Sequence, residues 1–349
     1  MTNIKRCFDV MSGIGEYPLM LPRRNRKMRP QTERWDAYSN GCLLCDDVPI
    51  SIRLRQNDTN VYQCTTCGLT FLHPLPRERD LFALYLQYDN MDESHNQFFS
   101  HLAWRKKSRR AVFREVLAEI LRYKSGGALL EIGCSFGFFL RMAEGSGFQT
   151  RGVDLSLRAV QYAKETLKLS VKHGTVFDAR FPDDSFDVVT MLGVLEHLPN
   201  PVETLREVVR ILRKDGILVV EVPNAKFNLA RGKISPSLFY IGNHLYNFTP
   251  NALTKMLEAC GFRCARVWCG KGDHRSGWLF NTVKFCYVLA ARLLQRVFGW
   301  YWGPSLIALA VKACKLAAPD QRPAATQRFM LRGEFRHLSS APAYRPHRG

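Results

Sequence analysis

One stretch, from Ala128 to Ser156, constrains the possible fold of this chain more than any other. It opens with a short apolar run, Ala128 to Ile132, which is too short and too evenly apolar for an amphipathic helix and is typical of a buried parallel strand. A turn flanked by glycines, Gly133 to Gly137, follows. An expected helix, Phe138 to Glu144, and a second expected strand, Gln149 to Val153, come next. This order predicts a β-turn-α-β unit, the repeating element of an α/β sheet.

This unit is suited to a nucleoside-like ligand. A glycine turn offers backbone N–H groups at the start of a helix, and an acidic side chain about 20 residues further on can accept both ribose hydroxyls. Asp154 follows the second strand and stands 23 residues after Glu131. The turn reads GxxxG and lacks the GxGxxG of dinucleotide sites. We therefore expect a ligand without phosphates, with an ordinary strand-to-helix turn as the alternative.

Four ordered motifs resemble those of the class I S-adenosylmethionine-dependent methyltransferases (type 11/23-like). The first, Glu131 to Gly137, is similar to the family motif acidic-x-Gly-x-Gly-x-Gly, although Ser135 stands where the middle glycine is most common. The others resemble strand four with its approach, the segment after it and the turn into strand five: Phe181 to Val189, Val194 to Pro201 and Leu212 to Asn224. The resemblance implies an α/β fold with a Rossmann-like seven-stranded sheet, and methyl transfer from S-adenosylmethionine.

The resemblance also implies how this cofactor would be held. The glycine turn would pass under the methionine part, Asp154 would hold the ribose, and Leu155 would pack on the adenine. Val176 and Phe177, after strand three, would wall the adenine, and Leu192 at the end of strand four would lie near the sulfonium. The cofactor-binding residues expected on this basis are Glu131, Gly133, Cys134, Ser135, Gly137, Asp154, Leu155, Val176, Phe177 and Leu192.

Two of the implied contacts leave alternatives open. Glu131 would orient either the turn or the amino group of the cofactor. Thr175 stands where relatives commonly carry a Gly-Asp pair, so the partner of the adenine amino group is not fixed, and Asp178 is the alternative.

Two CxxC pairs, Cys42 to Cys45 and Cys64 to Cys67, are separated by 18 residues, which is within the spacing of a four-cysteine zinc site. Four thiolates leave no open coordination position, so the zinc ion would be structural. A redox dithiol and structural thiols are the alternatives, and His73 is a further possible ligand. A similar module with a Pro-rich exit, here Phe71 to Pro76, occurs in methyltransferases that modify sugars and secondary metabolites.

Methyl transfer from a sulfonium requires donor and acceptor to be held in line, and an acceptor hydroxyl or carbon acid also needs a general base. The segment Asn243 to Thr249 resembles the HEHxxYFS segment of zinc-containing sugar C-methyltransferases, and His244 matches its second histidine. Asn243 and Asn247 replace the glutamate and a tyrosine of that pattern. These replacements favour a hydroxyl acceptor over a carbon acid.

His244 is thus the first candidate for the general base, and His197, in the pair Glu196-His197, is the second. Tyr240 and Tyr246 are expected to line the acceptor pocket. The favoured function is methyl transfer to a small-molecule or glycan acceptor, such as a sugar hydroxyl. An RNA methyltransferase and a non-catalytic scaffold that keeps the fold are the alternatives.

The formal net charge of the 349 residues is +19 and is unevenly distributed. Residues 1–35 hold eight Lys or Arg against three acids, and residues 312–349 hold eight against two. Residues 1–35 and 317–349 are predicted to be disordered. Basic tails of this kind are either merely solvated or contact nucleic acid, anionic lipid or a phosphorylated substrate.

Cysteine content and hydropathy indicate the cellular compartment in which the protein is expected. An odd number of cysteines, 11, and no apolar signal segment at the N-terminus predict a reduced, cytoplasmic setting. No stretch reaches the roughly 18 to 20 apolar residues needed to span a bilayer. The aromatic cluster Phe298 to Trp302 is compatible with peripheral contact at a membrane surface, with core packing or a substrate pocket as the alternatives.

We expect a basic extension (1–35), a zinc-ribbon-like module (36–78), a helical lid or linker (79–126), a methyltransferase domain (127–316) and a basic tail (317–349). The basic cluster Arg105 to Arg110 of the lid is interpreted as a solvated helix face. Asn200 and Thr249 are expected helix caps. The remaining elements are expected at 157–167, 201–212 and 251–259 for helices, and at 170–173, 186–192, 217–222, 263–268 and 305–313 for strands.

Overall fold

The computed structural model describes residues 42–45, 50–56, 59–73, 75–76, 81, 107–225, 227, 244–270, 303 and 305–313. The predicted basic tails, the aromatic cluster Phe298 to Trp302 and the expected pocket residue Tyr240 lie outside these residues. The predicted division into five parts stays a prediction.

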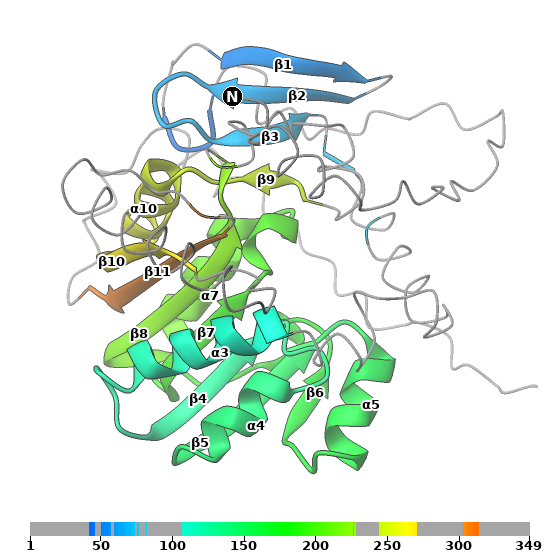
Figure 1. Ribbon diagram of the computed structural model, residues 1–349, viewed down its shortest axis with the longest axis vertical. Helices are drawn as coiled ribbons and strands as arrows, with labels where there is room; N and C mark the ends of the chain where they lie inside the picture. Colours follow the sequence, from blue (N-terminus) through cyan, green and yellow to red (C-terminus); the bar gives the residue numbers. More distant parts are fainter. Residues whose placement is uncertain are drawn as a thin grey trace, which may run out of the picture. The chain divides into compact units, whose positions relative to one another are not determined.

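A seven-stranded sheet forms the centre of the described structure, in the order β10-β11-β8-β7-β4-β5-β6 (Figure 1). Neighbouring strands pair in parallel, except that β11 is antiparallel to both β8 and β10. The predicted Rossmann-like sheet of seven strands is therefore confirmed. The strands are β4 (Gly127–Ile132), β5 (Phe148–Asp154), β6 (Val171–His173), β7 (Phe186–Leu192), β8 (Leu212–Pro223), β10 (Phe262–Cys269) and β11 (Ser305–Lys312).

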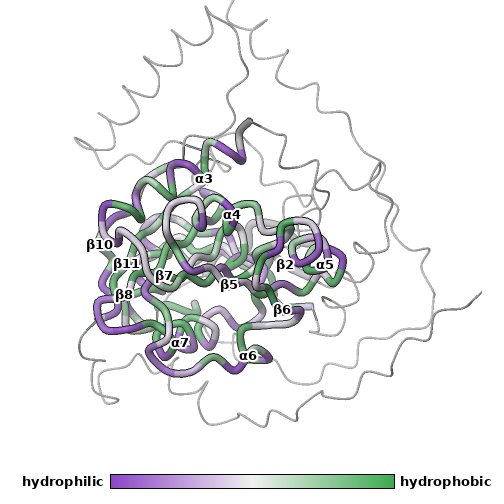
Figure 2. The backbone as a smooth tube through the Cα atoms, turned by 90° about the horizontal axis from the view of Figure 1, so that it is seen from below, coloured by the Kyte–Doolittle hydropathy of each residue, from purple (hydrophilic) through white to green (hydrophobic). Residues whose placement is uncertain are grey.

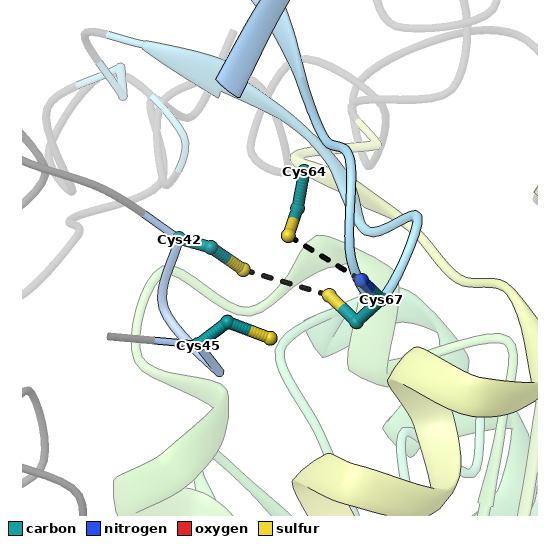
Figure 3. Close-up of side chains that lie close together, drawn as sticks. All are labelled: Cys42, Cys45, Cys64 and Cys67. Atoms are coloured by element: carbon teal, nitrogen blue, oxygen red, sulfur yellow. Dashed lines mark hydrogen bonds between the residues drawn. The ribbon is translucent and has the colours of Figure 1, made fainter. Parts of the chain in front are cut away.

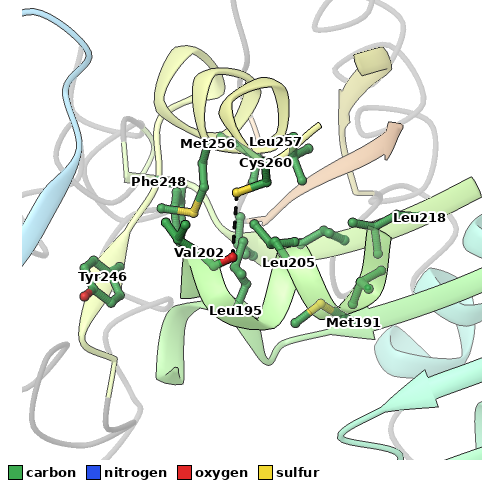
Figure 4. Close-up of a cluster of buried hydrophobic side chains, with 14 of the residues drawn as sticks. Met191, Leu195, Val202, Leu205, Leu218, Tyr246, Phe248, Met256, Leu257 and Cys260 are labelled. Atoms are coloured by element: carbon green, nitrogen blue, oxygen red, sulfur yellow. Dashed lines mark hydrogen bonds between the residues drawn. The ribbon is translucent and has the colours of Figure 1, made fainter. Parts of the chain in front are cut away.

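Helices cover both faces of this sheet, because successive side chains of a buried strand point to opposite sides. In β4, Leu129 packs in one hydrophobic cluster and Leu130 in the other. The Leu129 side is covered by α3 (Lys107–Ile120), α4 (Phe138–Glu144) and α5 (Leu157–Glu165). The Leu130 side is covered by α6 (Val176–Ala179), α7 (Pro201–Ile211) and α10 (Pro250–Ala259) (Figures 2 and 4). None of the described helices is long and apolar enough to cross a membrane.

Of the two expected helix caps, one makes a side-chain capping bond in the structure and the other does not. Thr249 caps α10 as predicted, since its Oγ1 accepts a hydrogen bond from the backbone N–H of Ala252 at 3.1 Å. Asn200 occupies the N-cap position of α7, but its side chain makes no capping bond. The predicted N-cap position is therefore confirmed without the side-chain hydrogen bond, and Pro201 at the first helical position needs no partner for a backbone N–H.

Strand β8 begins at Leu212, five residues before the predicted start. Leu212 pairs with Phe186, and the register then shifts so that Ile217 pairs with Val188. Asp215 has a φ of 58° within this irregular stretch. The sequence between these two pairs is polar and does not alternate, so it does not predict a strand. The start of β8 depends instead on pairing with its partner strand.

A second sheet, of four strands, contains β1 (Ile50–Gln56), β2 (Thr59–Cys64), β3 (Thr70–His73) and β9 (Tyr246–Asn247) in that order (Figure 1). All of its pairings are antiparallel. Strand β9 belongs to the segment in which acceptor residues were expected, and no strand was predicted there. A two-residue strand has no periodicity to detect, and it forms only because β3 offers it a partner.

Replacement of Leu205 tests the core between α7 and the sheet. Leu205 is fully buried, and truncating a buried leucine leaves a cavity, so Leu205→Ala should lower the free energy of unfolding by about 2 to 5 kcal/mol in a denaturant titration. Leu157 is 48% exposed and serves as the matched control. Leu157→Ala should cost less than about 1 kcal/mol, and equal losses for the two variants would contradict this packing.

Candidate active site

The glycine turn lies at the carboxyl end of β4 and is tied to the end of β5. The backbone N–H groups of Gly133 and Cys134 both donate to the carbonyl oxygen of Val153, at 2.8 and 3.1 Å. The N–H of Ser135 donates to Oδ2 of Asp154 at 2.7 Å. The turn and the acidic residue predicted to hold the ribose are therefore adjacent, as ligand sites of open α/β sheets require.

Three residues of this turn have left-handed backbone conformations: Gly133 (φ 71°), Ser135 (φ 48°) and Gly137 (φ 77°). A Cβ on Gly133 would stand 2.3 Å from Cγ2 of Val194, and one on Gly137 would stand 2.4 Å from Cδ1 of Leu169. Ser135 adopts the same region at some conformational cost, which explains why the related motif commonly has glycine at its position.

The predicted ribose and adenine residues follow the carboxyl ends of β5 and β6. Asp154 accepts hydrogen bonds from the N–H groups of Ser135 and Ser156, so its carboxylate is held in place at the mouth of the turn. Leu155 is half-buried, and its carbonyl oxygen lies 3.0 Å from Nε2 of His173. Phe177 is 47% exposed and presents an aromatic ring at this edge, whereas Val176 is buried in the core.

Thr175 and Asp178 form a capping box at the start of α6. Oδ2 of Asp178 accepts from the N–H and the hydroxyl of Thr175, at 2.9 and 2.6 Å, and Oγ1 of Thr175 accepts from the N–H of Asp178 at 3.2 Å. The hydrogen bond from the Thr175 side chain lowers the pKa of Asp178. Asp178 was the alternative partner for the adenine amino group. Its Oδ2 already accepts the hydrogen bonds of this helix cap.

Glu131, near the end of β4, is a buried carboxylate, and within the described residues its Oε2 has no hydrogen-bond partner. Burial raises the pKa of Glu131 well above its usual value, and the nearby Asp154 raises it further. Cys134 is buried as well, and burial likewise raises the pKa of its thiol. A positively charged group placed beside Glu131 would stabilise its carboxylate.

Arg109 ties α3 to the carboxyl-terminal parts of β7 and β8. Its Nη1 donates to Oε2 of Glu221 in β8 at 2.5 Å, and its Nη2 donates to the carbonyl oxygen of Leu192, the last residue of β7, at 2.9 Å. The predicted solvated face therefore does not apply to Arg109. The sequence carried no signal for this pair, because 112 residues separate Arg109 from Glu221.

The two histidines that were alternative candidates for the base lie together. The ring centroids of His197 and His244 are 4.7 Å apart and their planes cross at 76°. Nε2 of His197 is 3.8 Å from Oε1 of the buried Glu196. The ligand-type atoms of Glu196, His197 and His244 all lie within 4.8 Å of one another. The structure thus brings the three residues into one cluster, named here the acceptor-side cluster.

Two hydrogen bonds hold this cluster together. The N–H of Leu245 donates to the carbonyl oxygen of Glu196 at 2.7 Å, which joins the start of β9 to the 3₁₀ helix η3 (Leu195–His197). The hydroxyl of Tyr246 donates to the carbonyl oxygen of Pro199 at 3.3 Å. The ring of Tyr246 is completely buried and lies beside the α7–α10 core (Figure 4).

Burial also sets the ionisation of this cluster. It lowers the pKa of His244 to about 4, so this imidazole is neutral at neutral pH. Burial, with a smaller contribution from the charge of Glu221, raises the pKa of Glu196 to about 8. Within the described part of the chain, Oε2 of Glu196 and Nδ1 of His244 are buried without a hydrogen-bond partner.

The four predicted metal ligands form a second cluster, in which all four cysteine side chains point toward one centre (Figure 3). Cys42 and Cys45 flank one turn, and Cys64 and Cys67 flank the turn between β2 and β3. The sulfur atoms of Cys42 and Cys67 are 3.6 Å apart. Thiolates held tetrahedrally around zinc at about 2.3 Å lie about 3.8 Å apart, so this spacing fits the ion.

The surroundings of the cysteines also suit a closed metal site. All four cysteines are buried. The hydrogen bond from Cys42 lowers the pKa of Cys67 to about 5, whereas burial raises the pKa of Cys45 to about 11. Nζ of Lys255 in α10 lies 3.6 Å from the sulfur of Cys45. A cation at this position partly offsets the negative charge that four thiolates bring to the site.

Alanine at Gly133 tests the turn as a cofactor site. Because its φ is 71° and a Cβ would meet Val194, Gly133→Ala should weaken S-adenosylmethionine binding at least about tenfold in a calorimetric titration. Gly145, at the end of α4, has a φ of −62° and its nearest neighbour is 3.5 Å away. Gly145→Ala is the control and should bind normally. Equal affinities for both variants would contradict a role of the turn.

Serine at Cys64 tests the four-cysteine site. Cys64→Ser should lower the bound metal by one ion per chain and lower the unfolding temperature, because structural zinc stabilises the fold that binds it. Cys264 lies outside the cluster and is half-buried, so Cys264→Ser is the control. Elemental analysis and calorimetry measure the two effects, and unchanged metal content in Cys64→Ser would exclude the site.

Comparison with known proteins places this geometry in a family. A family described as methyltransferase domain matches residues 76–267. A Mycolicibacterium smegmatis protein named "Probable S-adenosylmethionine-dependent methyltransferase" is 27% identical over 42% of this chain. The 27-O-demethylrifamycin SV methyltransferase of Amycolatopsis mediterranei is 34% identical over 30% of the chain, and a demethylmenaquinone methyltransferase of Listeria welshimeri is 29% identical over 38%.

The chain spans 57%, 41% and 55% of the lengths of these three relatives, in the same order. The similarity to them is therefore confined to part of each protein. The family match covers more than half of this chain and includes the glycine turn, the acidic residue after β5 and the segment that follows β7. The chain therefore belongs to the family described as methyltransferase domain.

Proposed function

We propose that this chain transfers the methyl group of S-adenosylmethionine to a hydroxyl group of a small-molecule or glycan acceptor. One observation carries the proposal: the segment after β7 contacts the glycine turn and also carries half of the acceptor-side cluster. Val194 packs against Gly133, and Glu196 and His197 follow two and three residues later. A methyl donor on the turn would therefore lie beside residues able to bind and activate an acceptor.

The cofactor half of the proposal uses residues around the turn. Asp154 would accept the ribose hydroxyls, and Leu155 and Phe177 would contact the adenine. Glu131 would receive the positively charged amino group of the cofactor, which supplies the partner that its buried Oε2 lacks among the described residues. Leu192, whose carbonyl oxygen is fixed by Arg109, would lie near the sulfonium.

The acceptor half uses the two histidines. A neutral imidazole can accept the proton that an acceptor hydroxyl loses as it attacks the methyl carbon. His244 is neutral because burial lowers its pKa to about 4, and the adjacent His197 is the second proton acceptor. Tyr246 is assigned a positioning role, since its ring is buried and its hydroxyl is bonded to Pro199.

Two further features support a small-molecule acceptor and a structural metal. One relative is named as a methyltransferase for an oxygen atom of rifamycin SV and another for demethylmenaquinone, both small molecules. The buried four-cysteine cluster has the spacing of a zinc site. We assign this cluster a structural zinc ion, because a site with four thiolates leaves no position for a substrate.

A pair of variants separates the two halves of the site. Asp154→Asn should lower S-adenosylmethionine affinity at least about tenfold, because Asp154 fixes the turn and faces the ribose position. His244→Ala should keep the affinity but reduce turnover at least about a hundredfold, as loss of a general base does. Calorimetry gives the affinities, and release of S-adenosylhomocysteine with sugars, nucleotide sugars and phenols as acceptors gives the turnover.

Each variant serves as the control for the other. Normal turnover in His244→Ala would remove this residue from the mechanism. A folded wild-type chain that does not bind S-adenosylmethionine would contradict the proposed function as a whole.

A further inference from the structure

The acceptor-side cluster has the composition of a metal site. Glu196 offers a carboxylate oxygen, and His197 and His244 each offer a ring nitrogen, all within 4.8 Å of one another. The 3.8 Å between Nε2 of His197 and Oε1 of Glu196 is longer than a hydrogen bond. Ligands around an ion at about 2.1 Å are separated by about 3 to 4.2 Å. Small side-chain movements would therefore complete the coordination.

Two atoms of this cluster need a partner. Glu196 is only 2% exposed. Its Oε2 and Nδ1 of His244 are buried, and neither makes a hydrogen bond to any part of the chain that the structure describes. Buried polar atoms nearly always have a partner, so two orphaned atoms in one cluster indicate a missing group. A carboxylate oxygen and an imidazole nitrogen can both be satisfied by one cation.

Arg109, the nearby cation, is committed elsewhere. Its guanidinium donates hydrogen bonds to Glu221 and to the carbonyl oxygen of Leu192. The side chain of His197 is about one-fifth exposed, whereas that of Glu196 is almost completely enclosed. An ion held here would thus have one open side, and that side would be available to an acceptor.

The backbone holds the three ligands in place independently of any ion. Glu196 and His197 are neighbours in η3, and the N–H of Leu245 fixes the chain beside His244 to the carbonyl oxygen of Glu196 at 2.7 Å. Pairing of β9 with β3 fixes the same segment from its other side. Such preorganisation of ligands is required of a metal site that keeps open positions for a substrate.

We propose that Glu196, His197 and His244 bind a divalent transition-metal ion of the zinc or cobalt type, at a site distinct from the four cysteines. Two imidazoles and one carboxylate select such ions, whereas magnesium and calcium prefer oxygen ligands. Three protein ligands leave coordination positions open, in contrast to the closed four-cysteine site. The metal site follows from the geometry, and only its catalytic role rests on the proposed function.

In that role the ion would take over the activation assigned above to the histidines. An acceptor hydroxyl bound to a divalent cation has a lowered pKa and releases its proton to water. The oxygen lone pair then forms the bond to the methyl carbon. The carbon–sulfur bond breaks at the same time, and its electron pair stays on sulfur, so the sulfonium becomes a neutral thioether. The products are the methyl ether and S-adenosylhomocysteine.

Cobalt substitution of the full-length chain tests the proposal, because thiolate ligands give an intense charge-transfer absorption that histidine and carboxylate ligands do not. Wild type should hold two cobalt ions per chain by elemental analysis. Glu196→Gln, His197→Ala and His244→Ala should each hold one, with the thiolate absorption unchanged. His173 lies outside the cluster, so His173→Ala is the control and should hold two.

His197→Ala remains informative if His244→Ala does not fold. The thiolate absorption reports folding around the four cysteines in every variant. Wild type with one cobalt and full thiolate absorption would overturn the metal site, as would two ions in His197→Ala. Turnover by a wild type that holds one ion would leave the proposed function intact. Two ions without S-adenosylmethionine binding would support the metal site and contradict the proposed function.

Discussion

The pairing of β9 with β3 is the interaction on which the arrangement of the acceptor side depends. Two residue pairs, Thr70 with Asn247 and Phe71 with Tyr246, join a strand of the cysteine module to a segment that precedes α10. The N–H of Leu72 also donates to the carbonyl oxygen of Leu245 at 3.0 Å, and Oγ1 of Thr249 donates to that of Cys67. A backbone fixed in this way leaves His244 little freedom of position.

The four cysteines consequently have a role beyond their own module. They belong to the same hydrophobic cluster as the buried residues of α7 and α10, and Lys255 of α10 reaches the sulfur of Cys45. A metal ion bound by these cysteines would order the two cysteine turns and with them β3, which pairs with β9. In the proposed function, these strands would support one wall of the acceptor side.

Much of the fold could be predicted because its signals are local. The glycine turn, the buried runs of β4 and β7, and the Thr249-Pro250 start of α10 lie where the sequence indicated them. The cysteine cluster was also predictable, because each pair closes a short turn. Three features gave no local signal: the start of β8, the strand β9 and the contact of Arg109 with Glu221. Each depends on a partner many residues away in the chain.

The acceptor-side cluster shows most clearly what the sequence determined and what only the tertiary structure decided. The sequence identified His197 and His244 as alternative candidates for the general base, since an imidazole can accept a proton near neutral pH. It offered them as alternatives, because 46 residues lie between them in the chain. Only the tertiary structure decided that they lie at one place, beside the buried Glu196. The physical reason is that backbone bonds from β3 and Glu196 hold the β9 segment against η3, and no local pattern encodes such a long-range register.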